Sequence, residues 1–262
     1  MRVLVINPFG DTEFYGRENL ERIARPDTDF EVVNIADMYP LRNNQWLYFR
    51  YMCTDGTLER VLLAEREGYD AVFISCCLDI GLYEARQLVD IPVTATLESA
   101  ALVAHMMGAS YSLVPVDYQN GKIQEMLLTT YGLHDHFVSL RPFHIDANDL
   151  YPDQTQSPQV IEAVTEAARA CVQQDGAEVV IPGCTLASSV LTHEVSDAES
   201  AVGAPVVDGM VTGFKMAEMM AELHAAGVPT ISRRGWFEKP PAEDFDVLRN
   251  FLGRPVWDKT GV

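Results

Sequence analysis

A chain of 262 residues, of which 48% are hydrophobic, is long enough to bury a substantial core in one large or two medium-sized domains. Its formal net charge of −19 makes binding to nucleic-acid phosphates or to an anionic membrane surface unfavourable, because the whole molecule repels both. We therefore expect a small-molecule ligand, with no nucleic acid and no membrane as partner.

The start of the chain and its cysteines predict a cytoplasmic protein. The apolar stretch at residues 3–6 is too short for a signal peptide, and no run approaches membrane-spanning length. Five cysteines, an odd number at irregular spacing, are typical of reduced thiols rather than of a disulfide framework.

Short apolar runs alternate with segments of helical period along the chain. The predicted strands cover residues 3–6, 30–33, 71–74, 92–95, 111–114, 179–181 and 206–207. This alternation predicts a parallel sheet with helices on both faces. We expect one helix to stop before Gly68, a second to begin at Ser157-Pro158 and to bury Cys171, and a third to be capped by Asp208.

Three stretches break this alternation. Residues 39–51 are crowded with aromatic side chains, which either cover a cleft or a subunit interface or form part of the core. Beyond Gly227 the chain carries prolines and two tryptophans with little helical period, so we expect this tail to wrap over the body or over a neighbouring subunit of a homo-oligomer. Residues 146–158 have the turn residues of a linker.

Two segments repeat one unit. Gly68 and Gly176 each open an apolar run that ends in a cysteine eight residues later, at Cys76 and Cys184. Downstream of each cysteine a second match follows, between Ile91-Pro92-Val93 and Ala204-Pro205-Val206. Because the carboxyl ends of parallel strands form the ligand-binding edge of such sheets, a duplication would bring both thiols to one cleft.

Two opposed thiols can take a proton from one face of a carbon and return it to the other face, which is a racemisation. We expect Cys76 and Cys184 each to precede a helix, whose amino end lowers the thiol pKa and offers N–H donors to a developing enolate. The alternative is that both cysteines simply fill the core. Cys77 points the other way along its strand, into the core or beside the site.

Other residues give weaker signals. The six histidines show no metal-ligand spacing with the cysteines, so we expect no metal. Asn7-Pro8-Phe9-Gly10 follows the first strand and should line the cleft, but it is neither a dinucleotide fingerprint nor a phosphate loop, so we expect no nucleotide cofactor. Asp79 and His193 either assist the thiols or are solvated loop residues.

Taken together, the sequence resembles the Asp/Glu/hydantoin racemase superfamily, specifically its hydantoin and allantoin racemase branch. The resemblance rests on Val5-Ile6-Asn7-Pro8, Cys76 to Leu82, Tyr131-Gly132-Leu133, Gly183-Cys184 and Val206-Val207-Asp208-Gly209. It implies an α/β fold of two similar Rossmann-like lobes with parallel sheets, related by a pseudo-twofold duplication. The substrate would lie between the lobes, Cys76 and Cys184 would be the acid/base pair, and no cofactor would be needed. We expect residues 1–95 with 208–262 to form the first lobe and 96–207 the second.

Departures from the family pattern bear on the substrate. Phe9 and Gly10 stand where the family has a polar pair, and the run from Ser112 to Asp117 stands where the family has two threonines. Both changes favour a larger, partly apolar ligand, and we expect a hydantoin-like cyclic compound. The residues expected to bind it are Asn7, Phe9, Cys77, Val116 and Thr185.

Three other functions stay open. Relatives of the maleate isomerase type use the first cysteine as a nucleophile, and relatives of the arylmalonate decarboxylase type need only the second. Because both thiols are present, the decarboxylase is disfavoured and the isomerase is not. A two-lobed binding protein without catalysis is the third possibility.

Overall fold

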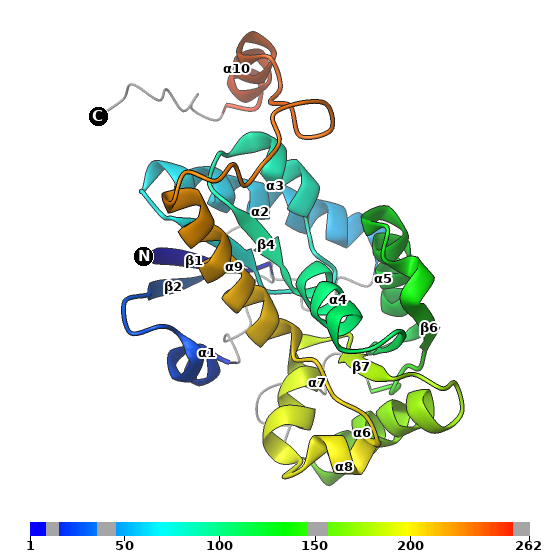
Figure 1. Ribbon diagram of the computed structural model, residues 1–262. Helices are drawn as coiled ribbons and strands as arrows, with labels where there is room; N and C mark the ends of the chain where they lie inside the picture. The colour runs from blue at the N-terminus through cyan, green and yellow to red at the C-terminus, as the bar shows by residue number, and fades with distance from the viewer. Residues whose placement is uncertain (9–15, 36–45, 146–156, 254–262) are drawn as a thin grey trace.

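The computed structural model describes residues 1–8, 16–35, 46–145 and 157–253, which form two parallel sheets flanked by helices (Figure 1). The first sheet has the order β2-β1-β3-β4, from β1 (Arg2–Asn7), β2 (Asp29–Asn34), β3 (Ala71–Ile74) and β4 (Val93–Ala95). The second has the order β6-β5-β7, from β5 (Tyr111–Val114), β6 (Phe137–Leu140) and β7 (Val179–Pro182). The predicted fold class is confirmed.

The strand order repeats in the two halves. Strands β3, β5 and β7 are buried along their whole length, which explains their unbroken apolar sequences. Val206 pairs in parallel with Val180 of β7, just as β4 pairs with β3. Where a strand was predicted at 206–207, the structure has only one isolated β-bridge, between Val206 and Val180. The sequence analysis also missed β6, because this edge strand is only half-buried and lacks a continuous apolar run.

Helices cover both sheets. They are α1 (Arg17–Ile23), α2 (Leu47–Arg66), α3 (Leu82–Leu88), α4 (Thr96–Met107), α5 (Tyr118–Tyr131), α6 (Pro158–Gln173), α7 (Thr185–Ser189), α8 (Ala198–Val202), α9 (Gly209–Ala225) and α10 (Ala242–Phe251), with a 3-10 turn η1 (His134–His136) and a π-helical segment η3 (Val190–Glu194). Pro158 begins α6 as predicted, although the Ser157 side chain makes no capping hydrogen bond. Cys171 is fully buried on this helix, also as predicted.

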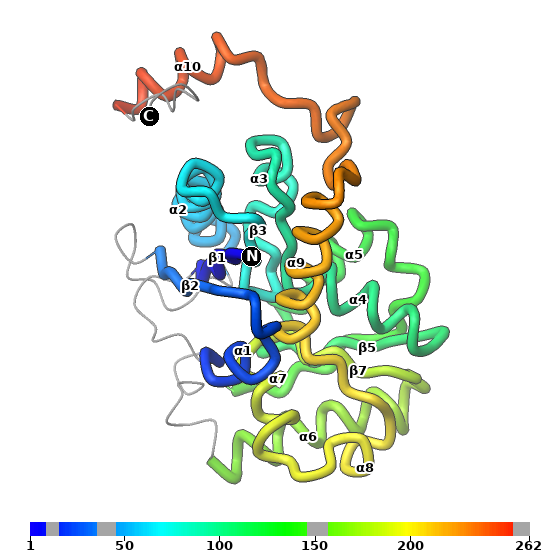
Figure 2. The backbone as a smooth tube through the Cα atoms, turned by 60° about the vertical axis from the view of Figure 1, so that its left-hand side comes forward, coloured from blue at the N-terminus to red at the C-terminus, as the bar shows by residue number. Residues whose placement is uncertain are grey.

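Helix α9 returns from the second sheet to the first. The Asp208 carboxylate caps it, as predicted, by accepting from the N–H groups of Met210 and Val211. Its apolar residues, Phe214 among them, pack with Phe73 against the first sheet. Helices α4 and α9 lie side by side in the middle of the molecule, as Figures 1 and 2 show from two directions. The lobe boundaries expected at 95/96 and 207/208 stay a prediction.

The irregular stretches differ in part from expectation. Residues 36–45 of the aromatic stretch and 146–156 of the expected linker lie outside the described residues. Tyr48 and Tyr51, at the start of α2, are 68% and 70% exposed, so this end of the aromatic stretch is not core. The tail does run over α3, where the Gln87 side chain donates to the carbonyl of Trp236 at 2.7 Å. It then continues into α10, a helix that the sequence analysis missed.

No helix among the described parts of the chain is both long enough and apolar enough to cross a membrane. Whether the protein is a homo-oligomer stays a prediction.

The packing of α9 against the first sheet leaves no room at Gly213. A Cβ atom there would overlap the ring of Phe73, which is buried in β3. We expect Gly213→Ala to lower the free energy of unfolding by about 1–3 kcal/mol, the usual cost of overpacking, despite the better helix propensity of alanine. Urea denaturation would measure this, with Met219→Ala on the exposed side of α9 as control. A more stable Gly213→Ala protein would contradict this packing.

Candidate functional site

The carboxyl ends of β3 and β7 meet. The Cys77 sulfur, just past β3, lies 3.8 Å from the carbonyl oxygen of Pro182, the last residue of β7. Cys76 and Cys184 are close enough to interact electrostatically, and this interaction contributes to the raised pKa of Cys76. The two cysteines that the repeat singled out therefore lie in one region of the molecule, just past the carboxyl ends of β3 and β7.

Cys76 opens a tight turn rather than a helix. Its side chain is buried, and the N–H of Leu78 donates to its sulfur at 3.4 Å. The turn passes through left-handed backbone conformations at Asp79 and Gly81 before α3 begins. Burial raises the pKa of Cys76 to about 12, against the smaller lowering effect of the Leu78 amide. The expectation of a helix amino end that lowers this thiol's pKa is therefore wrong, because α3 starts too late to reach the sulfur.

Cys184 does stand directly before a helix, α7, as predicted. It is half-buried, whereas the other four cysteines are buried. Burial raises its pKa, and the amides of Ala187 and Leu186 in the first turn of α7 act in the opposite direction. Desolvation is the larger effect, so the expected net lowering is wrong for this thiol too.

A buried carboxylate stands beside the Cys76 turn. Asp79 is 2% exposed and accepts hydrogen bonds from the N–H groups of Leu97 and Glu98, at the start of α4, each at 2.8 Å. The hydroxyl of Tyr131, at the end of α5, donates to it at 3.0 Å. Burial raises the pKa of Asp79 to about 7, although the two amides and the hydroxyl favour the ionised form. Asp79 is thus no solvated loop residue.

A second carboxylate, which is half-buried, lies in the second half of the chain. Asp208, the cap of α9, has its pKa raised by burial, while the amides of Val211 and Met210 and the hydroxyl of Thr192 act to lower it. An electrostatic interaction with His193 also acts to lower the pKa of Asp208. The Nε2 atom of His193 is buried and has no hydrogen-bond partner among the described residues.

The residues expected to bind substrate have different surroundings. Asn7 is buried at the end of β1 and its amide donates to the Asn34 side chain at 2.9 Å. Thr185 is the half-buried first residue of α7. Val116 belongs to an apolar cluster with residues of α6, so it packs as a core residue. Phe9 lies outside the described residues.

Several polar groups around the thiols had no role predicted from the sequence. Tyr131 was noted only as part of a family motif. The Nη2 of Arg50 donates to the carbonyl of Leu78 at 3.3 Å. Four buried polar atoms near the cysteines have no hydrogen-bond partner among the described residues: Arg50 Nε, Ser75 Oγ, Ser188 Oγ and Ser189 Oγ. Ser75 directly precedes Cys76, and both other serines lie on α7, which follows Cys184.

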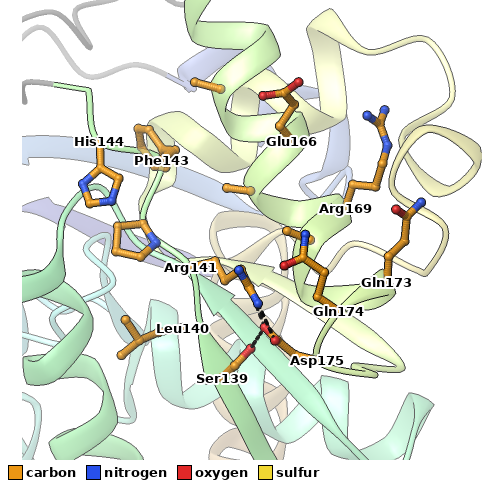
Figure 3. Close-up of a pocket in the computed structure, with 14 residues that line it drawn as sticks. Ser139, Leu140, Arg141, Phe143, His144, Glu166, Arg169, Gln173, Gln174 and Asp175 are labelled. Atoms are coloured by element: carbon orange, nitrogen blue, oxygen red, sulfur yellow. Dashed lines mark hydrogen bonds and ion pairs between the residues drawn. The ribbon is translucent and has the colours of Figure 1, made fainter.

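A separate groove of about 750 Å³ lies between α6 and β6 with its following segment (Figure 3). Arg141 points toward Asp175 there, and its guanidinium makes two hydrogen bonds to that carboxylate, at 2.5 and 2.6 Å. None of the described residues that line the groove comes from the turns after Cys76 and Cys184. The groove is therefore not part of the thiol site. The described residues also contain no group of three His, Cys, Asp or Glu side chains that could hold a metal ion.

Comparisons with known proteins give a consistent result. A family model described as Asp/Glu/Hydantoin racemase matches residues 3–217. A hydantoin racemase from Pseudomonas sp. (strain NS671) is 28% identical over 253 residues, which cover 96% of this chain and 97% of that protein. The structure of allantoin racemase from Klebsiella pneumoniae has a TM-score of 0.76 at 25% identity, covering 91% of this chain and 93% of that one. The structure of arylmalonate decarboxylase matches 84% of this chain and 92% of that one, with a TM-score of 0.56 at 16% identity. This match shows a shared fold alone.

The raised pKa of Asp79 predicts a pH dependence of stability. Between pH 3.8, the ordinary pKa of an aspartate, and about pH 7, Asp79 is protonated in the folded chain and ionised in the unfolded chain. The free energy of unfolding should therefore fall as pH rises through this window, by on the order of 4 kcal/mol for this group. Asp79→Asn should remove that slope in urea denaturation at several pH values. Asp175→Asn is the control, since Arg141 lowers the pKa of Asp175 and its contribution has the opposite sign.

The five thiols should differ in their reactivity toward iodoacetamide. Cys184 is the least buried, and the amides of α7 favour its thiolate, so it should be alkylated first, at a rate that rises with pH above neutrality. Each unit of pKa difference changes the thiolate fraction about tenfold. Peptide mass spectrometry of the folded protein measures the order, with the urea-unfolded protein as control. Equal labelling of all five cysteines in the folded state would contradict the described burial.

Proposed function

Because this chain belongs to the Asp/Glu/hydantoin racemase family and is a racemase, we propose that it inverts an acidic carbon beside a carbonyl group by moving protons between that carbon and two thiols, Cys76 and Cys184. The observation that supports the pair is the meeting of the ends of β3 and β7, where the Cys77 sulfur lies 3.8 Å from the carbonyl oxygen of Pro182. Each thiol comes from one copy of the repeat, so the two approach the substrate from different halves of the molecule.

The proposed reaction is balanced by the two thiols alone. One cysteine is present as thiolate and removes the hydrogen of the substrate carbon as a proton. The C–H bond breaks, its electron pair moves into the enolate, and an S–H bond forms. The other cysteine, present as thiol, gives its proton to the opposite face, so that a new C–H bond forms and a thiolate remains. No electron is gained or lost overall, and we propose that the reaction uses no cofactor.

The raised thiol pKa values have two opposite effects on this reaction: they make each thiolate a stronger base, and they lower the fraction of thiolate present at neutral pH. A carbon acid beside one carbonyl group is weak, and a proton transfers from it most readily to a base whose pKa is also high. Burial raises the pKa of both Cys76 and Cys184, so either one is a strong base once it is ionised. A racemase must convert each enantiomer into the other. Burial raises the pKa of both thiols, so each can act as the base in one direction of the reaction.

A cyclic ureide of the hydantoin type is the substrate class that we propose. The relatives named above are a hydantoin racemase and an allantoin racemase, and both names describe rings that carry a hydrogen on a carbon beside a carbonyl. The carboxylate of Asp79 is buried, that of Asp208 is half-buried, and both lie near the thiols, so a further anion beside them would be costly. A neutral ring avoids that cost. The unpartnered hydroxyl of Ser75 and Nε of Arg50 are polar groups that could bind its carbonyl and N–H groups.

Single replacements of the two cysteines should separate exchange from inversion. We expect Cys76→Ala and Cys184→Ala each to slow racemisation of a 5-substituted hydantoin by about 10²–10⁴-fold, the usual contribution of a positioned acid or base. In heavy water each variant should still exchange the hydrogen of one enantiomer, and the two variants should differ in which enantiomer that is. Chiral chromatography with mass spectrometry measures both quantities.

Cys171→Ala is the matched control, since it removes a thiol buried in α6. Racemisation at the wild-type rate by either cleft variant would exclude that cysteine as an acid or base. Carbon dioxide release from an arylmalonate, or geometric isomerisation of a diacid without racemisation, would instead favour one of the other enzyme classes. Binding of a hydantoin with no exchange at all would favour the binding protein.

A further inference from the structure

The amino ends of α4 and α9 meet in the middle of the molecule. Gly209 begins α9, and a Cβ atom there would lie 2.6 Å from Cγ2 of Thr96, the first residue of α4. The two helices also correspond in the repeat, because each follows its matching proline, Pro92 or Pro205, at the same distance. Two equivalent helix ends are therefore packed against each other beside the ends of β3 and β7.

Each of these helix ends binds one carboxylate, which is buried at α4 and half-buried at α9. At α4 the carboxylate is that of Asp79, held by the amides of Leu97 and Glu98 at 2.8 Å each. At α9 it is that of Asp208, held by the amides at the two corresponding positions, Met210 at 2.8 Å and Val211 at 3.2 Å. The carboxylates come from different places in the sequence, since Asp79 belongs to the turn after Cys76 and Asp208 directly precedes α9.

Asp79 and the Cys76 thiol are connected by backbone hydrogen bonds within one turn. The N–H of Asp79 itself donates to the carbonyl of Cys76 at 3.0 Å, and Leu78, the residue directly before Asp79, donates its N–H to the Cys76 sulfur. The backbone at Asp79 is left-handed, with φ of 42°, a conformation that costs energy for a residue other than glycine. The two amides and the Tyr131 hydroxyl hold the carboxylate and so keep the turn in this shape. Tyr131 ties it to α5, which packs with the second sheet.

Asp208 reaches the Cys184 segment through a chain of three contacts. Its carboxylate lies 3.3 Å from the hydroxyl of Thr192, in the π-helical segment η3. That hydroxyl has one proton and also lies 2.9 Å from the carbonyl oxygen of Ser188, so it donates to one of these two acceptors at a time. The amide of Ser188 donates to the carbonyl of Cys184 at 2.9 Å. The start of α7, which carries the second thiol, is thereby fixed to the start of α9.

We propose that Asp79 and Asp208 are a matched pair of positioning residues, Asp79 for the Cys76 thiol and Asp208 for the Cys184 thiol. The proposal rests on the two-thiol racemisation proposed above. Neither carboxylate needs to touch the substrate. Each binds an amide pair at a central helix end and so sets the place of one sulfur relative to the reacting carbon, where a misplacement of about 1 Å can cost 10²-fold in rate.

The test measures hydrogen exchange in heavy water separately from each enantiomer of a 5-substituted hydantoin. The Cys76→Ala variant first identifies the enantiomer whose exchange depends on Cys76, and Cys184→Ala identifies the other. Asp79→Asn should then slow exchange of the Cys76-dependent enantiomer by about 10- to 100-fold and leave the other within about twofold. Asp208→Asn should give the opposite pattern. In both variants kcat should fall while KM stays nearly constant, because substrate binding is not altered.

A milder pair of variants guards against loss of folding. Tyr131→Phe removes only the hydroxyl that donates to Asp79, and we expect the same enantiomer preference as in Asp79→Asn with a smaller loss. Tyr111→Phe is the matched control, since it removes a tyrosine hydroxyl of the same region that donates to the carbonyl of Leu133 at 2.7 Å. Tyr111→Phe should change the exchange rates of the two enantiomers only slightly, and by the same factor.

The outcomes separate this inference from the proposed function. If Cys76→Ala and Cys184→Ala do not affect opposite enantiomers, the two-thiol mechanism itself fails, and the inference fails with it. If they do, but Asp79→Asn and Tyr131→Phe slow both enantiomers equally or not at all, the positioning role is overturned while the racemase remains. A shared loss on both faces is what a general structural role would produce.

Discussion

Exclusion of water from the ends of β3 and β7 is the condition on which the site depends. The same desolvation raises the pKa values of Cys76, Cys184, Asp79 and Asp208. For a thiol that we propose takes a proton from carbon, a high pKa strengthens the thiolate as a base but lowers its fraction at neutral pH, whereas for a carboxylate a high pKa is a cost that hydrogen bonds have to offset. The amide pairs at the starts of α4 and α9 supply those bonds. Their positions follow from the packing of the two helix ends at Gly209 and Thr96.

Much of this arrangement could be predicted from the sequence. The buried strands were visible as apolar runs, and the repeat from Gly68 to Cys76 and from Gly176 to Cys184 correctly placed two thiols at strand ends that meet. The edge strand β6 was not visible, because half-buried strands carry no continuous apolar signal. Helix α10 was obscured by the prolines around it.

The electrostatics of the site could not be read from the sequence. A cysteine before a helix has a lowered pKa only if the helix amides outweigh desolvation, and burial is a property of the assembled fold. The contact between Tyr131 and Asp79 joins residues far apart in the chain, so no local pattern predicts it. Only the family motif around Tyr131 gave a hint, without a reason for it. Helix and sheet patterns thus predicted where the thiols lie, but not which polar groups surround them.

The return of α9 to the first sheet has a consequence for how the chain acquires its structure. The face of that sheet that carries Val3, Val5 and Phe73 is covered by residues near Phe214, which leave the ribosome long after the strands themselves. This apolar face of the first sheet therefore stays uncovered until the ribosome has synthesised the strands of the second sheet and then α9. Such non-local closure slows folding and exposes the nascent chain to aggregation, and it makes either half a poor candidate for independent expression.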